Sequence, residues 1–541
     1  MALDKGRESN TVEGAAISRQ RRWLITAGVM TGMFIAALEA TVVGTAMPTV
    51  IASLGGLNHY SWVFSAYLVT STVTVPVWGK LSDLYGRRLL YQIGIGVFLL
   101  GTLLSGLSGT MTQLIIFRAV QGLGAGALVP LGMTIIGDTF TIEERAKMQA
   151  YFSGVWGFSS IIGPVIGGFI TDQISWRWVF FVNLPIGVVA ALIIGIALKE
   201  PVVDRKPKID YAGALLLMTA ISLLMLAMVE GETGLFSTEN ILVFGASVVL
   251  LAAFVWVEMR AADPIIPFDL FRNRTILIAV IAGFLGGVAM FGAISFIPLF
   301  AQGSMGFTAT EAGSLLTPLM LTWVTMSVIG GRLLLRVGYK PITIIGYAAL
   351  TLGFILLALV DRDTPRIWLY ANLMLIGAGL GFSMLTLLIA VQQAVERSKL
   401  GIATSLNQFS RSIGGAIGVA VLGAVLTASL MTELKRAAAE HGPLTEQQAI
   451  EFASNPNALI EPEAKSKLSP ELLAVLQSAL ARAIHPVFWA GAFMAGLGLL
   501  VVLFLPSERE EEKVVEGERL IMAEQTNINA RNQPDIHDTQ S

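Results

Sequence analysis

The stretch GKLSDLYGRR, Gly79 to Arg88, places four charged side chains in ten residues of a largely apolar chain. From Trp23 to Trp78 the only ionised side chain is Glu39, and from Leu89 to Phe117 there is none. A charged, glycine-bounded segment between two long apolar runs is typical of a loop at a membrane surface. The stretch therefore indicates two membrane-spanning helices joined by a short loop.

The composition of the whole chain agrees with this interpretation. Of its 541 residues 54% are hydrophobic and 14% are charged, and the mean hydropathy is +0.70. A soluble domain has about a quarter charged residues. Apolar runs long enough to cross a bilayer need roughly 20 residues and must be helical, because lipid offers the backbone no hydrogen bonds. We expect an all-α integral membrane protein with fourteen spans, near 23–48, 60–78, 89–108, 112–136, 148–171, 178–198, 211–229, 241–257, 275–301, 312–334, 341–360, 367–391, 402–428 and 484–505.

Charge and cysteine content exclude several classes of protein. The net charge of −2 provides no basic surface for nucleic acid. Cysteine is absent, which excludes disulfides, thiolate catalysis and cysteine-bound metal. The first apolar run follows basic residues and is too long for a cleavable signal peptide, so we expect an uncleaved signal anchor.

The loops also predict the orientation and the domains. Basic residues concentrate in alternate loops, among them GKLSDLYGRR and VERSK, and this bias predicts that both termini are cytoplasmic. The predicted parts are a cytoplasmic N-terminal segment 1–22, a six-helix bundle 23–198, two additional transmembrane helices 211–257, a second six-helix bundle 275–505 with an outer loop 432–483, and a polar cytoplasmic tail 507–541.

The two predicted bundles repeat each other. GRLLLRVGYK, Gly331 to Lys340, is a degraded copy of the opening stretch in which Leu335 replaces the aspartate. SRSIGGAIG echoes SSIIGPVIG, and SFIPLF echoes TAMPTV, at nearly equal offsets of 252, 251 and 250 residues. Tandem repeats of this kind are typical of transporters.

The opening stretch resembles the signature loop of the major facilitator superfamily, which has the form Gly-x-Leu-Ser/Ala-Asp-x-x-Gly-Arg-Arg/Lys. The resemblance implies a latch that closes the inner side of the transporter. Gly79 allows close helix packing, Gly86 permits a tight turn, and Asp83 can face the N-terminus of a neighbouring helix. The alternative is a basic loop that only fixes topology. The residues expected in the latch are Gly79, Asp83, Gly86, Arg87, Arg88 and Asp138.

Three further segments are similar to motifs of the same family. LIIFRAVQGLGAGA places Arg118, Gln121 and Gly122 on one face of the span 112–136. LEATVVGTAMPTV resembles the motif of the fourteen-helix drug:proton antiporter branch, with Glu39 where the family usually has Asp. SSIIGPVIGGFI resembles the antiporter motif, in which small residues let helices approach closely, although generic packing is an alternative. The residues expected at its centre are Gly163, Pro164, Gly167 and Gly168.

Three charged side chains lie deep in the predicted spans: Glu39, Arg118 and Arg411. Such charges are costly in a membrane and usually serve function. Counting helical rise places Glu39 about 24 Å from the inner boundary and Arg118 about 9 Å below the outer one. The two are thus expected at similar depth, within reach of each other, where Glu39 can couple proton and substrate movement. A static Glu–Arg bridge is the alternative, and Arg411 is expected to compensate charge in the second half.

The sequence therefore predicts a secondary active transporter of the cytoplasmic membrane and not an enzyme. We expect a proton-coupled antiporter that exports lipophilic, often cationic drugs, or alternatively an exporter of an endogenous lipid, fatty acid or siderophore. A non-transporting receptor would not need Glu39, and no nucleotide-binding loop or hydrolase motif occurs. No cofactor is expected besides the proton gradient. The expected partners are a small lipophilic substrate, protons and the bilayer, with a periplasmic adaptor protein only in a two-membrane organism.

Overall fold

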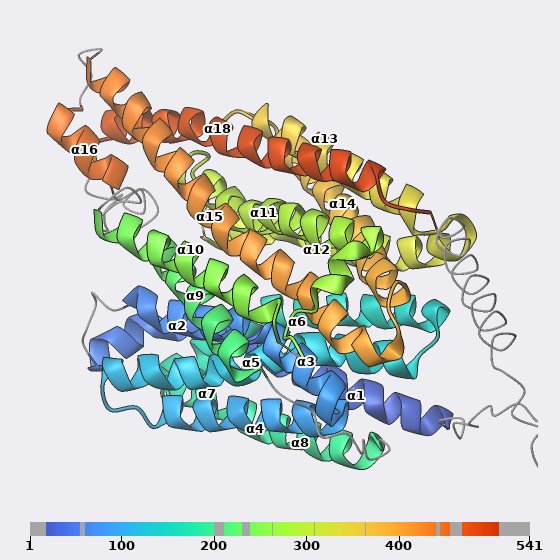
Figure 1. Cartoon of the computed structure of the whole chain (residues 1–541). Helices are drawn as coiled ribbons and strands as arrows, with labels where there is room; N and C mark the ends of the chain where they lie inside the picture. The colour runs from blue at the N-terminus through green and yellow to red at the C-terminus, as the bar shows by residue number, and fades with distance from the viewer. Residues whose placement is uncertain are drawn as a thin grey trace, which may run out of the picture.

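The computed structural model describes residues 18–54, 60–199, 210–229, 238–261, 263–307, 309–362, 364–439, 444–454 and 468–507. All regular elements in these ranges are helices, in agreement with the expected all-α fold (Figure 1). Most of the N-terminal segment 1–22, most of the tail 507–541 and the middle of the outer loop 432–483 lie outside the described residues.

Eleven helices in the described ranges are long and apolar enough to cross a membrane, and two shorter apolar helices accompany them. The protein is therefore a multi-pass membrane protein. The count of fourteen spans stays a prediction.

The N-terminal half forms one helical bundle, drawn in blue to cyan in Figure 1. Its helices are α1 (Arg19–Leu54), α2 (Tyr60–Val73), α3 (Val75–Tyr85), α4 (Arg87–Gly106), α5 (Met111–Thr139), α6 (Ile142–Gln173), α7 (Trp178–Phe181) and α8 (Asn183–Ala197).

The C-terminal half forms a second bundle, drawn in green-yellow to red. Its elements are η2 (Phe268–Arg272), α11 (Arg274–Gly303), α12 (Ala309–Val337), α13 (Tyr339–Ala358), α14 (Arg366–Gln393), η3 (Arg397–Lys399), α15 (Leu400–Ala439), α16 (Glu446–Ser454) and α18 (Pro470–Leu503).

The two bundles share one pattern of helix pairing. In the first, α5 contacts α2 and α4, and α1 contacts α6 and α8. In the second, α14 contacts α12 and α13, and α11 contacts α15 and α18. The turns before α4 and α13 also match, because Gly86 and Gly338 have φ of 93° and 78°, in the region that favours glycine. The sequence repeat is thus a structural repeat.

Two helices lie between the bundles, α9 (Tyr211–Val229) and α10 (Thr238–Glu258). In Figure 1 they lie at one side of the molecule, beside α2 and α15. Ile221 of α9 and Phe254 of α10 belong to a buried apolar cluster that also includes Val73 of α2 and Leu406 of α15. The extra pair therefore packs against both bundles at once.

Several helix boundaries differ from the predicted spans. The span expected at 60–78 is two helices, because Pro76 in the first turn of α3 lacks the N–H that would continue α2. α15 continues to Ala439 and α18 begins at Pro470, so the helices at both ends of the expected outer loop are continuous with the flanking spans. Ser469 caps α18 by accepting a hydrogen bond from the N–H of Leu472.

Glycine allows a close approach between α4 and α5. A Cβ at Gly101 would collide with the backbone of Gln121 on α5, whereas a Cβ at Gly96, also on α4, would meet no heavy atom within 4 Å. The two glycines therefore make a matched pair for testing helix packing.

Gly101→Ala is expected to destabilise the protein by about 1–3 kcal/mol, because the added methyl group must push α4 away from α5. Gly96→Ala is expected to be neutral or slightly stabilising, since alanine favours helix. Melting temperature and monodispersity of the purified variants in detergent measure both. Equal effects of the two substitutions would contradict the packing described here.

Candidate functional site

A buried ion pair joins α1 and α5 inside the N-terminal bundle. Arg118 Nη1 donates a hydrogen bond to Glu39 Oε1, and the two residues are 2% and 0% exposed. Asn183 Nδ2 of α8 donates to Glu39 Oε2 at 2.7 Å. Both oxygens of the carboxylate therefore have a donor, as a buried charge requires.

Further contacts hold the guanidinium of Arg118 in place. Its Nη1 also donates to Gln121 Oε1 at 2.6 Å, and its Nε donates to the carbonyl oxygen of Val63 at 3.2 Å. Its Cζ lies 4.3 Å from the centre of the Tyr67 ring, a cation–π contact. Gln121 Nε2 in turn donates to Thr102 Oγ1 at 2.8 Å. The network thus includes groups from α1, α2, α4, α5 and α8.

The antiporter-like motif lies on α6 beside this network. A Cβ at Gly163 would collide with Thr41 of α1, and Thr41 Oγ1 donates to the carbonyl oxygen of Ser159 at 3.1 Å. Gly167 is buried, whereas a Cβ at Gly168 would meet nothing within 4 Å. The side chain of Pro164 lies outside the described residues. Ser159 and Gly163 therefore bring α6 against the helix that carries Glu39.

Arg411 lies apart from this pair, on α15. Its Nη2 donates to Gln408 Oε1, one turn earlier on the helix. Its Nη1 lies 3.4 Å from Met384 Sδ of α14. Within the described residues it forms no ion pair. The structure therefore brings Glu39 and Arg118 together and leaves Arg411 in the other bundle.

A second polar cluster joins the bundles at the predicted cytoplasmic end. Asp83 Oδ1 and Oδ2 accept hydrogen bonds from the backbone N–H of Gly401 and Ile402, at 3.0 and 2.8 Å. These N–H groups belong to the first turn of α15, whose dipole favours a negative charge. A Cβ at Gly79 would collide with Ser405 of α15, so glycine allows the contact.

Arg87 connects the other charges of this cluster. It forms ion pairs with Asp83 at 2.6 Å and with Asp138 of α5 at 2.9 Å. It also donates to the carbonyl oxygen of Arg397 at 3.1 Å, and Arg397 pairs with Asp138 at 3.1 Å. Arg88 follows Arg87 in the first turn of α4. We call Asp83, Arg87, Asp138, Arg397 and the N-terminus of α15 the cytoplasmic latch.

The environment of Asp83 changes its acidity. Burial raises the pKa of Asp83 to about 6, although Arg87 and the two backbone N–H groups act in the opposite direction. The carboxyl group therefore changes protonation near the pH range in which cells work.

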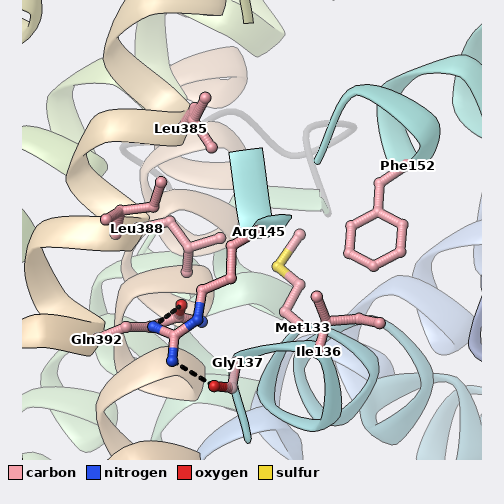
Figure 2. A pocket seen from close by; sticks show the side chains of 9 residues that line it. Met133, Ile136, Gly137, Arg145, Phe152, Leu385, Leu388 and Gln392 are labelled. Atoms are coloured by element: carbon pink, nitrogen blue, oxygen red, sulfur yellow. Dashed lines mark hydrogen bonds between the residues drawn. The ribbon is translucent and has the colours of Figure 1, made fainter. Parts of the chain in front are cut away.

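Figure 2 shows another contact between the bundles, which sequence analysis missed. Arg145 of α6 donates to Gln392 Oε1 of α14 at 3.3 Å, and also to the carbonyl oxygen of Gly137. Met133, Phe152 and Leu388 line the small pocket around it. Arg145 lies in the basic stretch EERAK, which the structure places at the start of α6.

Asn183 was missed as well. It is a neutral amide in an otherwise apolar span, and a search restricted to charged side chains passes over it. The signal that could have found it is a strong hydrogen-bonding group in a charge-free helix, which needs a partner in the membrane.

Comparisons with known proteins agree with this geometry. The sequence matches the Major Facilitator Superfamily over residues 29–419. It is 37% identical to the multidrug transporter protein MdtP of Bacillus subtilis (strain 168) over 519 residues, which cover 93% of this chain and 96% of that protein. It is 36% identical to multidrug resistance protein 3 of the same organism over 487 residues, covering 90% and 95%.

A solved structure gives the same result for the fold. The major facilitator superfamily proton:xylose symporter XylE matches 92% of this chain and 99% of its own, with a TM-score of 0.57 at 13% identity. Together with the extent of the family match, this leads to one conclusion. The chain belongs to the major facilitator superfamily of membrane transporters.

Proposed function

We propose that this protein is a proton-coupled antiporter that exports lipophilic, often cationic drugs across the cytoplasmic membrane. The names of the two Bacillus relatives support drug export. The observation that carries the proton coupling is the buried pair of Glu39 and Arg118, because a carboxylate fully enclosed among helices can exchange its proton only when the bundle opens.

The contacts of the pair suggest how the coupling works. When Glu39 takes up a proton, it loses its charge and its attraction to Arg118. The guanidinium then keeps Gln121 Oε1 and the Tyr67 ring as partners, and Asn183 still donates to Glu39. Glu39 and Arg118 thus keep polar partners whether Glu39 is protonated or ionised. A buried group that alternates between the two states needs such partners in both.

A cationic substrate acts on the same carboxylate. A positive charge near Glu39 favours its ionised form, and so promotes release of the proton. Proton uptake and substrate binding therefore compete, which is the requirement for antiport: the proton moves inward and the substrate outward.

The cytoplasmic latch supplies the second requirement, alternating access. Its contacts join α3, α4 and α5 to the start of α15, and so close the two bundles at the predicted cytoplasmic end. The substrate is released to the outside while the latch is closed, and the latch opens when the transporter must accept substrate from the cytoplasm.

An exporter of an endogenous lipid, fatty acid or siderophore is the second candidate, and Arg411 favours it. In the described residues this half-buried cation has no carboxylate partner, unlike Arg118. A free positive charge in the C-terminal bundle suits the acidic group of an amphipathic substrate. Transport of a panel of cationic drugs and anionic amphiphiles in a pump-deleted host distinguishes the two.

Glu39→Gln is expected to abolish proton-driven export while the protein still folds. Glutamine keeps the size and one acceptor oxygen, but it replaces the other oxygen with an NH₂ donor and cannot carry a proton. Leaving Arg118 without its countercharge is expected to destabilise the variant by up to about 3–5 kcal/mol. Drug efflux from energised vesicles, together with melting temperature, measures both effects.

The matched control is Glu39→Asp, which keeps a titratable group one methylene shorter and should retain a measurable share of coupled transport. Full export against a gradient by Glu39→Gln would eliminate Glu39 as the proton carrier.

Asp83→Asn is expected to reduce the transport rate without weakening substrate binding. Asparagine carries no charge and cannot titrate, so it shifts the balance between the latched and open states, and cycling between them slows. The latched carboxyl group, with its pKa of about 6, binds a proton more tightly than an exposed aspartate with a pKa near ~3.9. The latched population of the wild type should therefore increase as the pH falls from about 6 toward about 4, and that of Asp83→Asn should not.

Distances between spin labels on α3 and α15, recorded against pH, measure the latched population. Equilibrium binding of a fluorescent substrate is the control. Loss of binding by a well-folded Asp83→Asn, or an unchanged pH response, would contradict the latch.

A further inference from the structure

Two carboxyl groups meet at the predicted cytoplasmic ends of α9 and α10, away from the residues used above. Asp210 directly precedes α9, and Glu258 is the last residue of α10. Glu258 is only 2% exposed, so its carboxyl group is separated from water. One predicted span began at residue 211 and the next ended at residue 257. Both carboxyl groups therefore fell just outside the predicted spans and were not identified from the sequence.

Each carboxyl group uses one oxygen to accept a backbone hydrogen bond. Asp210 Oδ1 accepts from the N–H of Gly213 at 2.8 Å, which caps the start of α9. Glu258 Oε1 accepts from the N–H of Ile266 at 2.6 Å. The other oxygen of each group, Asp210 Oδ2 and Glu258 Oε2, is buried and has no hydrogen-bond donor in the described part of the chain.

These two remaining oxygens both face Gly213 in the first turn of α9. A Cβ at Gly213 would be 2.5 Å from Asp210 Oδ2 and 2.6 Å from Glu258 Oε2, so only glycine leaves room for them. The two side chains are within hydrogen-bonding reach of each other. Two ionised carboxylates cannot remain in such contact away from water, because both oxygens are acceptors and both charges repel.

We propose that Asp210 and Glu258 form a proton-binding site that holds one shared proton. The O–H of one carboxyl group donates to the free oxygen of the other, and the pair carries a single negative charge. The ligand is a proton and the site needs no other group. This inference concerns the extra helices and goes beyond the function proposed for Glu39.

The packing around the pair indicates what the proton does. Ile265 and Ile266 are 1% and 6% exposed, and belong to the apolar cluster that contains Val73 of α2 and Leu406 of α15. The N–H of Ile266 donates a hydrogen bond to Glu258, and Glu258 in turn shares the proposed proton with Asp210. The proton therefore stabilises the packing of the segment after α10, and of the extra helices, against both bundles.

Among the described residues, no other charged side chain pairs with Asp210 or Glu258 in place of the proton. The guanidinium of Arg260 lies 4.2 Å from the Trp256 ring and donates to the Trp256 carbonyl oxygen. Asp210 is the charged side chain that acts on Glu258. Three other charged residues occupy the segment that leads into α11, and within the described residues none forms an ion pair with Asp210 or Glu258: Asp263, Asp269 and Arg272. From α2 and α15 the cluster receives apolar side chains.

The sign of the pH dependence follows from linkage. The proton is bound while the pair is packed and is released to water when the segment opens. Opening is therefore favoured as the cytoplasmic pH rises, by up to about tenfold for each pH unit. The extra helices thus give the transporter a contact that weakens in an alkaline cytoplasm.

The test measures hydrogen exchange at the N–H of Ile266 and the melting temperature of the full-length protein in nanodiscs, from about pH 6 to about pH 9. In the wild type we expect protection of this N–H, corrected for the intrinsic exchange rate, to fall as the pH rises. Glu258→Gln and Asp210→Asn each supply an N–H donor in place of the shared proton, so each should keep the low-pH protection across the range. Glu239→Gln, at the exposed start of the same α10 helix, is the control and should behave like the wild type.

Three outcomes would overturn the proposal. The first is wild-type protection that does not change with pH, and the second is a pH response that survives in both amide variants. The third is a cation site: added Na⁺ or Mg²⁺ would raise the melting temperature of the wild type and not of Glu258→Gln. None of these measurements requires transport, so a failure here is distinct from a failure of the role of Glu39.

Discussion

A charge placed where water cannot reach must find its partner inside the protein, and the polar groups of this transporter are arranged by that requirement. Glu39 has Arg118 and Asn183 as partners, and Arg118 has additional contacts with Gln121 and Val63. The network connects five helices that the apolar cores alone would pack less specifically. Removing either charge leaves the other unpaired in a medium of low dielectric. In the proposed antiport cycle, this is why protonation of Glu39 can move helices.

The same requirement explains how the bundles meet at the predicted cytoplasmic end. Asp83 accepts hydrogen bonds from N–H groups of the opposite bundle, so these bonds exist only while α3 and α15 touch. Small residues make this possible, since a side chain at Gly79 would collide with Ser405. In the second repeat Leu335 occupies the place of the aspartate, so the charge-dependent contact exists once. Such an asymmetric contact can act as a gate, because it links the two repeats and does not stabilise either alone.

The sequence predicted the membrane fold and the contact of Glu39 with Arg118 from the spacing of apolar and charged residues along helices. It predicted the structural repeat from motifs that recur at nearly equal offsets. It did not predict the break before Pro76 or the continuation of α15 to Ala439, since packing decides where an apolar helix stops. It missed the pairing of Asp210 with Glu258 for a different reason. Each residue lies at the edge of a span, where a charge is ordinary, and only the folded structure brings the two edges together.

The central claim is that Glu39 exchanges its proton for substrate. Proton release on substrate binding tests it most directly, measured with a pH indicator in a weakly buffered solution of the purified protein. The account predicts release of up to about one proton for each substrate bound by the wild type, and none for Glu39→Gln at saturating substrate. Equal proton release by both proteins, or tight binding to the wild type with no release at all, would contradict it.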